Sequence, residues 1–343
     1  MSADLATVAW LTGLATDIES GPSPFSAAPV VVLDPDGSAL LATSEDEAEG
    51  AADDVDVRAF PGFAVEDVDR AGESARVVLE AVAGARAVAV DLATLPGTVA
   101  AALAREGIDL ADVSADLRRA RAVKDREEVE AIRHAIAVAD AGQAAARAAL
   151  AVGRTELDLW TETRGAMERA AGGRIPVLAD LVTGPRTADV GGLPGDRAVA
   201  QGDLLLVDLV PRVGAYWADS CATVAVDEAP VEARRAHDAS RHALERAIAL
   251  CRSGTRVEDI DAAARETVAE AGGAYPHHTG HGIGTAYHEE PRVIGGTDRV
   301  LEPGMMVALE PGAYGDGWGV RVEQVVVVTE GKPEILSGHD LAL

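Results

Sequence analysis

LLLVDLVPRVGAYWADSCATV, residues 204–224, is the stretch that decides how the second half of this chain folds. Apolar runs stand on both sides of a short turn, and each has the pattern of a β-strand. A two-residue turn at Val213 and Gly214 would place Asp208 directly opposite Asp219, about 5 Å away on the same face of the hairpin. Two carboxylates held that close repel each other, so the sequence predicts a cation between them.

A second acid-bearing hairpin is predicted within residues 305–328. Its turn is Asp316-Gly317, and Asp-Gly between apolar runs is the strongest short hairpin signal. Pairing about this turn sets Glu310 opposite Glu323. Pro311 distorts the ladder locally because it cannot donate a backbone hydrogen bond. The second half of the chain therefore offers two pairs of facing acids.

Between the hairpins lies a histidine flanked by glycines, His281 in the segment Gly280–Gly284. The glycines allow the backbone to approach a site closely and leave the imidazole free to project. Four carboxylates with one imidazole are a mainly hard ligand set, which suits Mn²⁺, Fe²⁺, Co²⁺ or Zn²⁺. Bridging carboxylates would hold two such ions about 3.5–4 Å apart with a nucleophilic water between them. The predicted metal ligands are Asp208, Asp219, His281, Glu310 and Glu323.

Each of these residues also has a plainer interpretation. Taken singly, Glu323 is more often a solvated acid at a strand end, and His281 a loop histidine, than a ligand. Asp208, however, lies within a strongly apolar run, where an unpaired charge is costly. The five residues together favour a metal site and predict hydrolytic chemistry.

At these residues the chain resembles the pita-bread metallopeptidases, the family of prolidase, aminopeptidase P and methionine aminopeptidase, and within it the Xaa-Pro aminopeptidases and Xaa-Pro dipeptidases. The resemblance implies an α+β fold. A pita-bread (creatinase/aminopeptidase-like) catalytic domain over residues 118–343 would follow a smaller α/β domain over residues 1–117. The segments that carry the resemblance are the hairpin from Asp208 to Asp219, Gly280–Gly284, His288-Glu289, Glu310-Pro311-Gly312, Gly319–Glu323, Arg121–Asp125 and Trp10–Gly13.

The resemblance also implies a role for each metal ligand. Asp208 would chelate one ion, and His281 and Glu310 would bind the other. Asp219 and Glu323 would bridge both. The implied reaction is hydrolysis of the peptide bond that precedes proline in a small peptide. Two divalent metal ions, manganese before cobalt, zinc or iron, are the implied cofactors, and a homodimer is the implied assembly.

Catalytic and substrate-binding residues are assigned by the same resemblance. His288 would donate to the scissile carbonyl or the tetrahedral intermediate, and Glu310 would also handle the proton of the water. His277 would shape the substrate pocket, with a plain loop histidine as the alternative. Arg321 would orient Glu323 or a substrate carboxylate, with a structural salt bridge as the alternative.

Two positions depart from the family pattern. Gly191 stands where the family has a substrate-facing histidine, and Ala222 stands where it has an arginine just before Thr223. These losses leave open a non-catalytic protein that keeps the pita-bread cavity, or a hydrolase of a non-peptide amide. They argue against a creatinase-type enzyme, because such enzymes keep that histidine and lack the metal ligands.

The composition limits the partners and the setting. The 343 residues carry a net charge of −27, which disfavours nucleic acid and anionic membranes as partners. Only two lysines occur, Lys124 and Lys332, and an acidic, lysine-poor chain suggests adaptation to high salt. Cys221 and Cys251 are too few for a disulfide framework, and no basic region opens the chain, so we expect a cytoplasmic protein without a signal peptide. Charges and a proline interrupt the apolar stretch 81–103, so no membrane span is expected.

Local patterns predict the remaining elements. Asp34-Pro35-Asp36-Gly37 forms a turn between the first two strands, and Ser44–Glu49 is a solvated helix start. Apolar spacing predicts a long helix over residues 125–151. Two helix pairs, each linked to an acid-bearing hairpin, also resemble the internal pseudo-symmetry of the pita-bread fold. The other expected elements are strands over 29–33, 39–42, 57–60 and 87–91, and helices over 66–83, 97–106, 156–171, 230–252 and 257–272.

Overall fold

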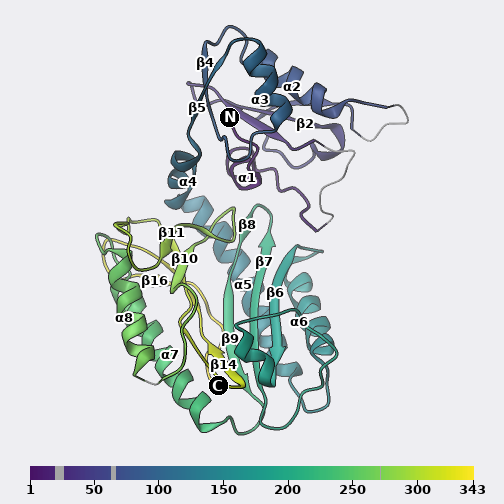
Figure 1. Cartoon of the computed structure of the whole chain (residues 1–343). Coiled ribbons are helices and arrows are strands. Elements are labelled where there is room, and N and C mark those ends of the chain that lie inside the picture. The colour runs from purple at the N-terminus through teal and green to yellow at the C-terminus, as the bar shows by residue number, and fades with distance from the viewer. Residues whose placement is uncertain (20–26, 63–66, 271) are drawn as a thin grey trace. The chain divides into compact units, whose positions relative to one another are not determined.

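The computed structural model describes residues 1–343 except 20–26, 63–66 and 271. The chain divides into two compact units, Met1–Arg121 and Ala122–Leu343 (Figure 1). Each helix among the described residues is too short or too polar to cross a bilayer. All of the predicted metal ligands lie in the second unit.

The first unit contains two small sheets and the helices that cover them. Its main elements are α1 Leu5–Thr12, β1 Val30–Leu33, β2 Ala39–Ser44, the 3-10 helix η1 Glu45–Glu47, β3 Asp56–Phe60, α2 Arg70–Ala81, β4 Ala87–Val90, α3 Gly97–Arg105, β5 Asp109–Asp112 and α4 Ser114–Ala122. β1 and β2 are antiparallel about the predicted turn, β3 is parallel to β2, and β4 and β5 are a separate parallel pair. Of the helix expected over 66–83, residue 66 lies outside the described residues.

The first half of the second unit is a helix pair packed on a sheet. Its elements are α5 Arg126–Ala149, α6 Glu156–Ala171, β6 Val177–Thr183, the 3-10 helix η2 Gly184–Asp189, β7 Leu204–Val213, β8 Tyr216–Trp217 and β9 Ser220–Ala225. α5 begins at a capping box, in which Asp125 and Glu128 each accept from the backbone N–H of the other. Val138 of α5, Leu159 of α6 and Leu205 of β7 share one apolar core.

The first acid-bearing hairpin turns one residue later than predicted. Val213 pairs with Tyr216, so the turn residues are Gly214 and Ala215. Gly214 has a φ of 59°, a left-handed conformation that glycine adopts readily and that a β-branched valine resists. The predicted turn at residues 213 and 214 is therefore wrong.

The corrected register changes which residue faces Asp208. Asp208 pairs with Cys221 instead of Asp219. The partner has moved by two residues, and because side chains in a strand alternate with a period of two, Asp219 stays on the same face as Asp208. Ala218 and Asp219 also lie outside the ladder, between β8 and β9. The two acids therefore still share a face, although they are not direct partners.

The second half of this unit repeats the arrangement of a helix pair on a sheet (Figure 1). Its elements are α7 Val231–Leu250, α8 Val257–Ala269, β10 Gly280–Gly282, β11 Glu289–Val293, β12 Met306–Leu309, β13 Gly312–Gly315, β14 Trp318–Arg321, β15 Gln324–Val327 and β16 Glu334–Ile335. The sheet order is β11-β10-β12-β15-β16. Leu244 of α7, Ile260 of α8 and Val307 of β12 share its core.

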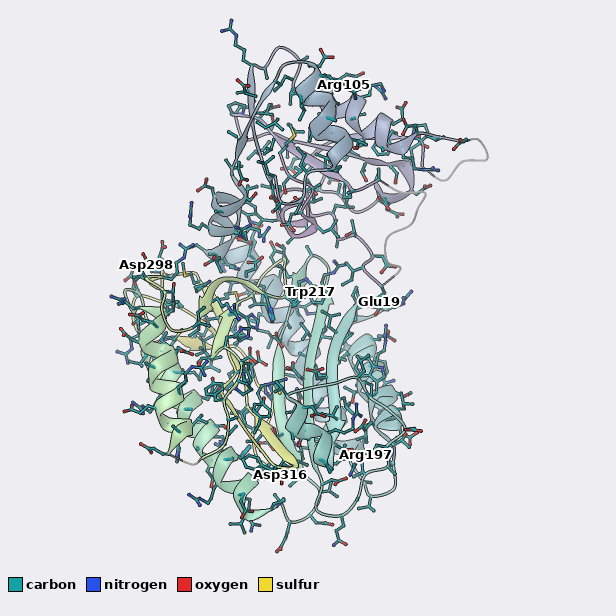
Figure 2. All side chains as sticks on the ribbon, viewed as in Figure 1. Glu19, Arg105, Arg197, Trp217, Asp298 and Asp316 are labelled. Carbon is teal, nitrogen blue, oxygen red and sulfur yellow. The ribbon has the colours of Figure 1, made fainter. Side chains whose placement is uncertain are left out.

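The second hairpin has the predicted register. Gly315 pairs with Trp318 about Asp316-Gly317, and Figure 2 labels Asp316 at this turn. β12 and β15 continue in the same register further from the turn. Glu310 and Glu323 occupy the interruptions between β12 and β13 and between β14 and β15, so they face each other as predicted.

Candidate active site

The structure brings the five predicted metal ligands together from both sheets. Asp208 lies in β7 and His281 in β10, whereas Asp219, Glu310 and Glu323 lie where strands are interrupted. Asp219, His281 and Glu323 each offer a ligand atom within 4.8 Å of the others. Nε2 of His281 lies 3.5 Å from Asp219 Oδ2 and 3.6 Å from Glu310 Oε1. The cluster is therefore compact enough for its carboxylates to share ions.

The interrupted strands hold their acids through hydrogen bonds to neighbouring segments. The backbone N–H of Glu323 donates to the carbonyl of Cys221 in β9 at 2.9 Å. The backbone N–H of Glu310 donates to the carbonyl of Thr279, just before β10, at 2.9 Å. These bonds satisfy backbone groups that the local hairpin leaves unpaired. They fix the direction in which each side chain enters the site.

Burial disfavours ionisation of three of the carboxylates. Burial and the nearby Glu310 raise the pKa of Asp219 to about 8. Burial also raises the pKa of Asp208, against the opposing effect of Arg321, and the pKa of Glu323 well above their ordinary values. Within the described part of the chain, Asp208 Oδ1 and Glu323 Oε1 are buried without a hydrogen-bond partner. Buried carboxylates with free oxygens fit divalent metal ions, which would supply the missing positive charge.

Glu310 differs from the other three acids. Burial acts to raise its pKa, but the hydrogen bond with His278 and the charges of His281 and Arg321 outweigh burial and hold the pKa at about 2. Nε2 of His278 lies 2.8 Å from Glu310 Oε1. Glu310 is therefore a carboxylate at neutral pH, in the form that can accept a proton.

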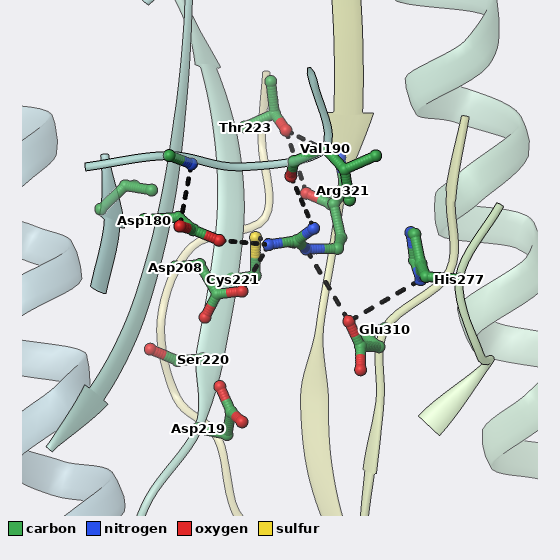
Figure 3. Close-up of polar contacts among 12 residues, drawn as sticks. Asp180, Val190, Asp208, Asp219, Ser220, Cys221, Thr223, His277, Glu310 and Arg321 are labelled. Carbon is green, nitrogen blue, oxygen red and sulfur yellow. Dashed lines mark hydrogen bonds and ion pairs between the residues drawn. The ribbon is translucent and has the colours of Figure 1, made fainter. Parts of the chain in front are cut away.

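Arg321 is a buried cation beside the acids (Figure 3). Its guanidinium donates to Asp208 and, at 3.1 Å, to the hydroxyl of Tyr314. Its Nε lies 3.8 Å from Glu310 Oε2. The expected partner was Glu323 or a substrate carboxylate, whereas the contact that the structure gives is with Asp208. Arg321 thus donates a hydrogen bond to Oδ2 of Asp208 and leaves Oδ1 available to a ligand.

His277 and His288 line the same pocket as the acids. The Tyr314 hydroxyl lies 3.0 Å from Nε2 of His277, whose Nδ1 lies 2.8 Å from the carbonyl of His278. Burial lowers the pKa of His277 to about 4. The ring of His288 is centred 4.1 Å from that of His281, and partial burial together with the charge of His281 lowers its pKa to about 4. Both imidazoles are therefore neutral at neutral pH, and each can donate one hydrogen bond.

Two residues of the site were missed by sequence reasoning. His278 stands next to His277, and that adjacency was the only signal for it. Asp180 lies in β6 and pairs with Asp208 across the β6–β7 ladder. No local pattern indicates that pairing, because residues 180 and 208 come from segments separated by a long connection.

When its metal ions are removed by a chelator, the protein is expected to lose stability as pH rises from about 7.5 to about 8. In this interval folded Asp219, with its pKa of about 8, keeps a proton that the unfolded chain, with a pKa near 3.8, has lost. The folded state then binds more protons, so the free energy of unfolding decreases with pH. The histidines with folded pKa values of about 4 oppose this change only near their ordinary pKa of 6.5, where the unfolded imidazoles still bind protons, and not above about pH 7.5.

Melting temperatures of chelator-treated and metal-loaded protein across this interval check the expectation. The metal-loaded protein should show the opposite slope, because ions bind the ionised carboxylates. A melting temperature of the chelated protein that rises over this interval contradicts the assignment of the raised pKa to Asp219.

Known proteins share this fold. The prolidase from Pyrococcus furiosus aligns with a TM-score of 0.82 at 23% identity, covering 99% of this chain and 96% of that one. The probable dipeptidase PepE from Mycobacterium tuberculosis is 39% identical over 219 residues, which is 62% of this chain and 58% of the relative. The Xaa-Pro dipeptidase from Pyrococcus furiosus is 31% identical over 222 residues, 64% of this chain and 63% of the relative. The matches thus span less than two thirds of each curated relative.

The repeated unit of a helix pair on a sheet, with a buried cluster of acids and imidazole between the halves, defines a protein with the pita-bread fold. The model of metallopeptidase family M24 matches residues 130–330. The chain belongs to metallopeptidase family M24, which confirms the family resemblance seen in the sequence.

Proposed function

We propose that this protein is a dinuclear metal-dependent peptidase that hydrolyses the bond before proline in small peptides, as an Xaa-Pro dipeptidase or aminopeptidase. The observation that carries the proposal is the convergence of His281 with four carboxylates, three of them buried and one half-buried, with free oxygens on Asp208 and Glu323. Relatives named dipeptidase and Xaa-Pro dipeptidase support a peptide as the substrate.

The ligand set divides between two ions. Asp208 would help to hold one ion and His281 and Glu310 the other, and Asp219 and Glu323 would contribute to both. Divalent ions bound there supply Lewis acidity, which polarises a carbonyl group and activates water. Manganese is the first candidate because the donors are mainly carboxylate oxygens.

Two side chains carry the proton transfer and the charge stabilisation. Glu310 is ionised at neutral pH and lies beside His281, so its carboxylate is placed to accept the proton of the attacking water. His288 is neutral and exposed in the pocket beside His281, so its N–H is available to the carbonyl oxygen as negative charge develops there. His277 shapes the wall next to Glu310.

The pocket above the acids has the size of a small-molecule site. Its volume is about 630 Å³, within the range of roughly 300–1,000 Å³ that ligand pockets occupy. Trp160, Leu178 and Tyr287 line its apolar side. A dipeptide or the first residues of a short peptide fit such a volume, which supports a small peptide substrate.

The two alternatives left open by Gly191 are less favoured. A binding protein without activity has no need of a complete ligand set, and the presence of all five predicted ligands close together supports a hydrolase instead. A hydrolase of a non-peptide amide would use the same chemistry as the proposed peptidase, and only a test of substrates distinguishes the two. A homodimer, a cytoplasmic setting and adaptation to high salt are further parts of the proposal, the last supported by the net charge of −27.

Hydrolysis assays with defined peptides test the proposed function. Protein loaded with Mn²⁺ or Co²⁺ is expected to cleave Xaa-Pro dipeptides faster than the matched Xaa-Ala dipeptides, and chelation should remove the activity. Cleavage of longer Xaa-Pro peptides indicates an aminopeptidase, whereas activity confined to dipeptides indicates a dipeptidase. Protein that binds metal and cleaves none of these peptides would overturn the proposal.

A further inference from the structure

β6 brings to the pocket an acid that the metal cluster does not use. Asp180 pairs with Asp208 across the ladder, so both side chains lie on the same face of the sheet (Figure 3). Its carboxylate accepts from the backbone N–H of Gly192 at 2.8 Å through Oδ1. The side chain is 39% exposed and lines the pocket. Its carboxylate therefore faces the space that a substrate occupies.

Gly191 provides the room for this carboxylate. A Cβ atom at Gly191 would lie 2.0 Å from Asp180 Oδ2, so the acid fills the space in which a side chain at this position would begin. By resemblance, a substrate-facing histidine normally stands at this position. This chain therefore presents the Asp180 carboxylate to the pocket at this position.

Arg321 forms an ion pair with Asp180 but leaves its carboxylate open to the pocket. Its Nη2 lies 3.8 Å from Asp180 Oδ2, close enough for an ion pair and too far for a hydrogen bond (Figure 3). Its donors are directed to Asp208, to the Val190 carbonyl at 2.8 Å and to the Tyr314 hydroxyl at 3.1 Å. The Arg321 side chain is only 4% exposed. A ligand entering the pocket meets the Asp180 carboxylate before it meets the guanidinium.

We propose that Asp180 selects substrates that carry a cationic group, which forms an ion pair with its carboxylate. This inference rests on the peptidase function proposed above and names the substrate class. Leu178 lies two residues earlier on the same face of β6, is 41% exposed and lines the same pocket. An apolar surface beside a carboxylate suits an aliphatic stem with a cationic end, as in lysine or arginine. The ammonium group of a peptide amino terminus offers the same chemistry.

Binding of three small amides to the metal-loaded protein tests the inference and separates the two sources of charge. Nα-acetyl-lysinamide carries only a side-chain cation, norleucinamide only an amino-terminal cation, and N-acetylnorleucinamide neither. At least one cationic compound is expected to bind about tenfold more tightly than the uncharged one, as a charge-assisted hydrogen bond predicts. Asp180→Asn is expected to remove that difference and leave binding of the uncharged compound unchanged.

The outcomes assign the cation or overturn the proposal. Preference for Nα-acetyl-lysinamide that depends on Asp180 indicates a basic side chain, and preference for norleucinamide that depends on it indicates the amino terminus. A wild-type protein without preference, or an Asp180→Asn variant with wild-type preference, overturns the inference. The binding measurement does not depend on turnover. If the protein cleaved no peptide, the proposed peptidase function would be refuted, but the binding measurement would still test the role of Asp180.

Two further variants guard against indirect effects. Gly191→Ala places a methyl group against the Asp180 carboxylate, so it should displace the acid and lower the same preference. Combined with Asp180→Asn, it should cause little further loss, since both changes act on one contact. Asp238→Asn removes an exposed acid on α7 outside the pocket and should keep the wild-type preference. Melting temperatures establish that each variant is folded.

Discussion

Asp219→Asn is expected to lower metal affinity by about 100-fold and to remove hydrolysis, because the proposed metal site would lose a charged oxygen ligand. The same change should raise the melting temperature of the chelated protein near pH 8. The carboxylate of Asp219 has a pKa of about 8, so its ionisation opposes folding when no cation balances it, and a neutral amide avoids that cost. One substitution thus has opposite effects on the metal-free and the metal-loaded protein.

Metal analysis after dialysis and calorimetry with and without chelator measure both effects. Asp238→Asn is the matched control, since it removes an equal charge from an exposed position on α7. It should leave metal content and activity unchanged. An Asp219→Asn protein that retains the wild-type metal content would falsify the placement of Asp219 between the ions.

Lys124→Met is expected to reduce the free energy of unfolding by about 3–5 kcal/mol, the usual cost of leaving one partner of a buried ion pair without the other. Nζ of Lys124 lies 2.8 Å from Glu289 Oε2, and both side chains are 1% exposed. The other oxygen of Glu289 accepts from the backbone N–H of Ala286 at 3.0 Å. The pair therefore joins the start of α5 to the loop that carries His288, so kcat should fall together with stability.

A double variant and a control separate the ion pair from general damage. Lys124→Met combined with Glu289→Gln should recover much of the lost stability, because no buried charge then remains unpaired. Lys332→Met alters the other lysine of the chain, which is exposed, and should change stability by less than about 0.5 kcal/mol. Denaturant unfolding gives these values, and equal losses in the single and double variants would show that the pair is not the cause.

Local signals were sufficient for most of the elements. The capping box at Asp125 and the apolar spacing that follows set α5, and α6 has the predicted bounds of Glu156–Ala171. Asp316-Gly317 fixed the second hairpin because its glycine takes the positive φ that such a turn needs, 74° here. In the first hairpin, the sequence pattern alone placed the turn one residue too early. The turn lies at Gly214 and Ala215 because Gly214 can adopt the positive φ that the turn requires.

The chemistry of the site was also partly local. Asp208 and Asp219 remained on one face despite the register error, because the error moved the partner by an even number of residues. The partners of His278 and Arg321 could not be predicted from the sequence, because they depend on contacts between strands that are far apart in the chain. The bond of His278 to Glu310 lowers the pKa of Glu310, and the guanidinium of Arg321 lies on Asp208.

By itself, the sequence determined the helices, the second hairpin, the set of acids and histidines, and through them the family. Turn conformation, helix capping and side-chain periodicity depend on residues close together in the chain, so a single sequence contains them. Only the tertiary structure decided that β6 lies beside β7, which sets Asp180 against Asp208, and that Lys124 meets Glu289. Such contacts join segments far apart in the chain, and they form because whole elements pack together, which no local window of sequence specifies.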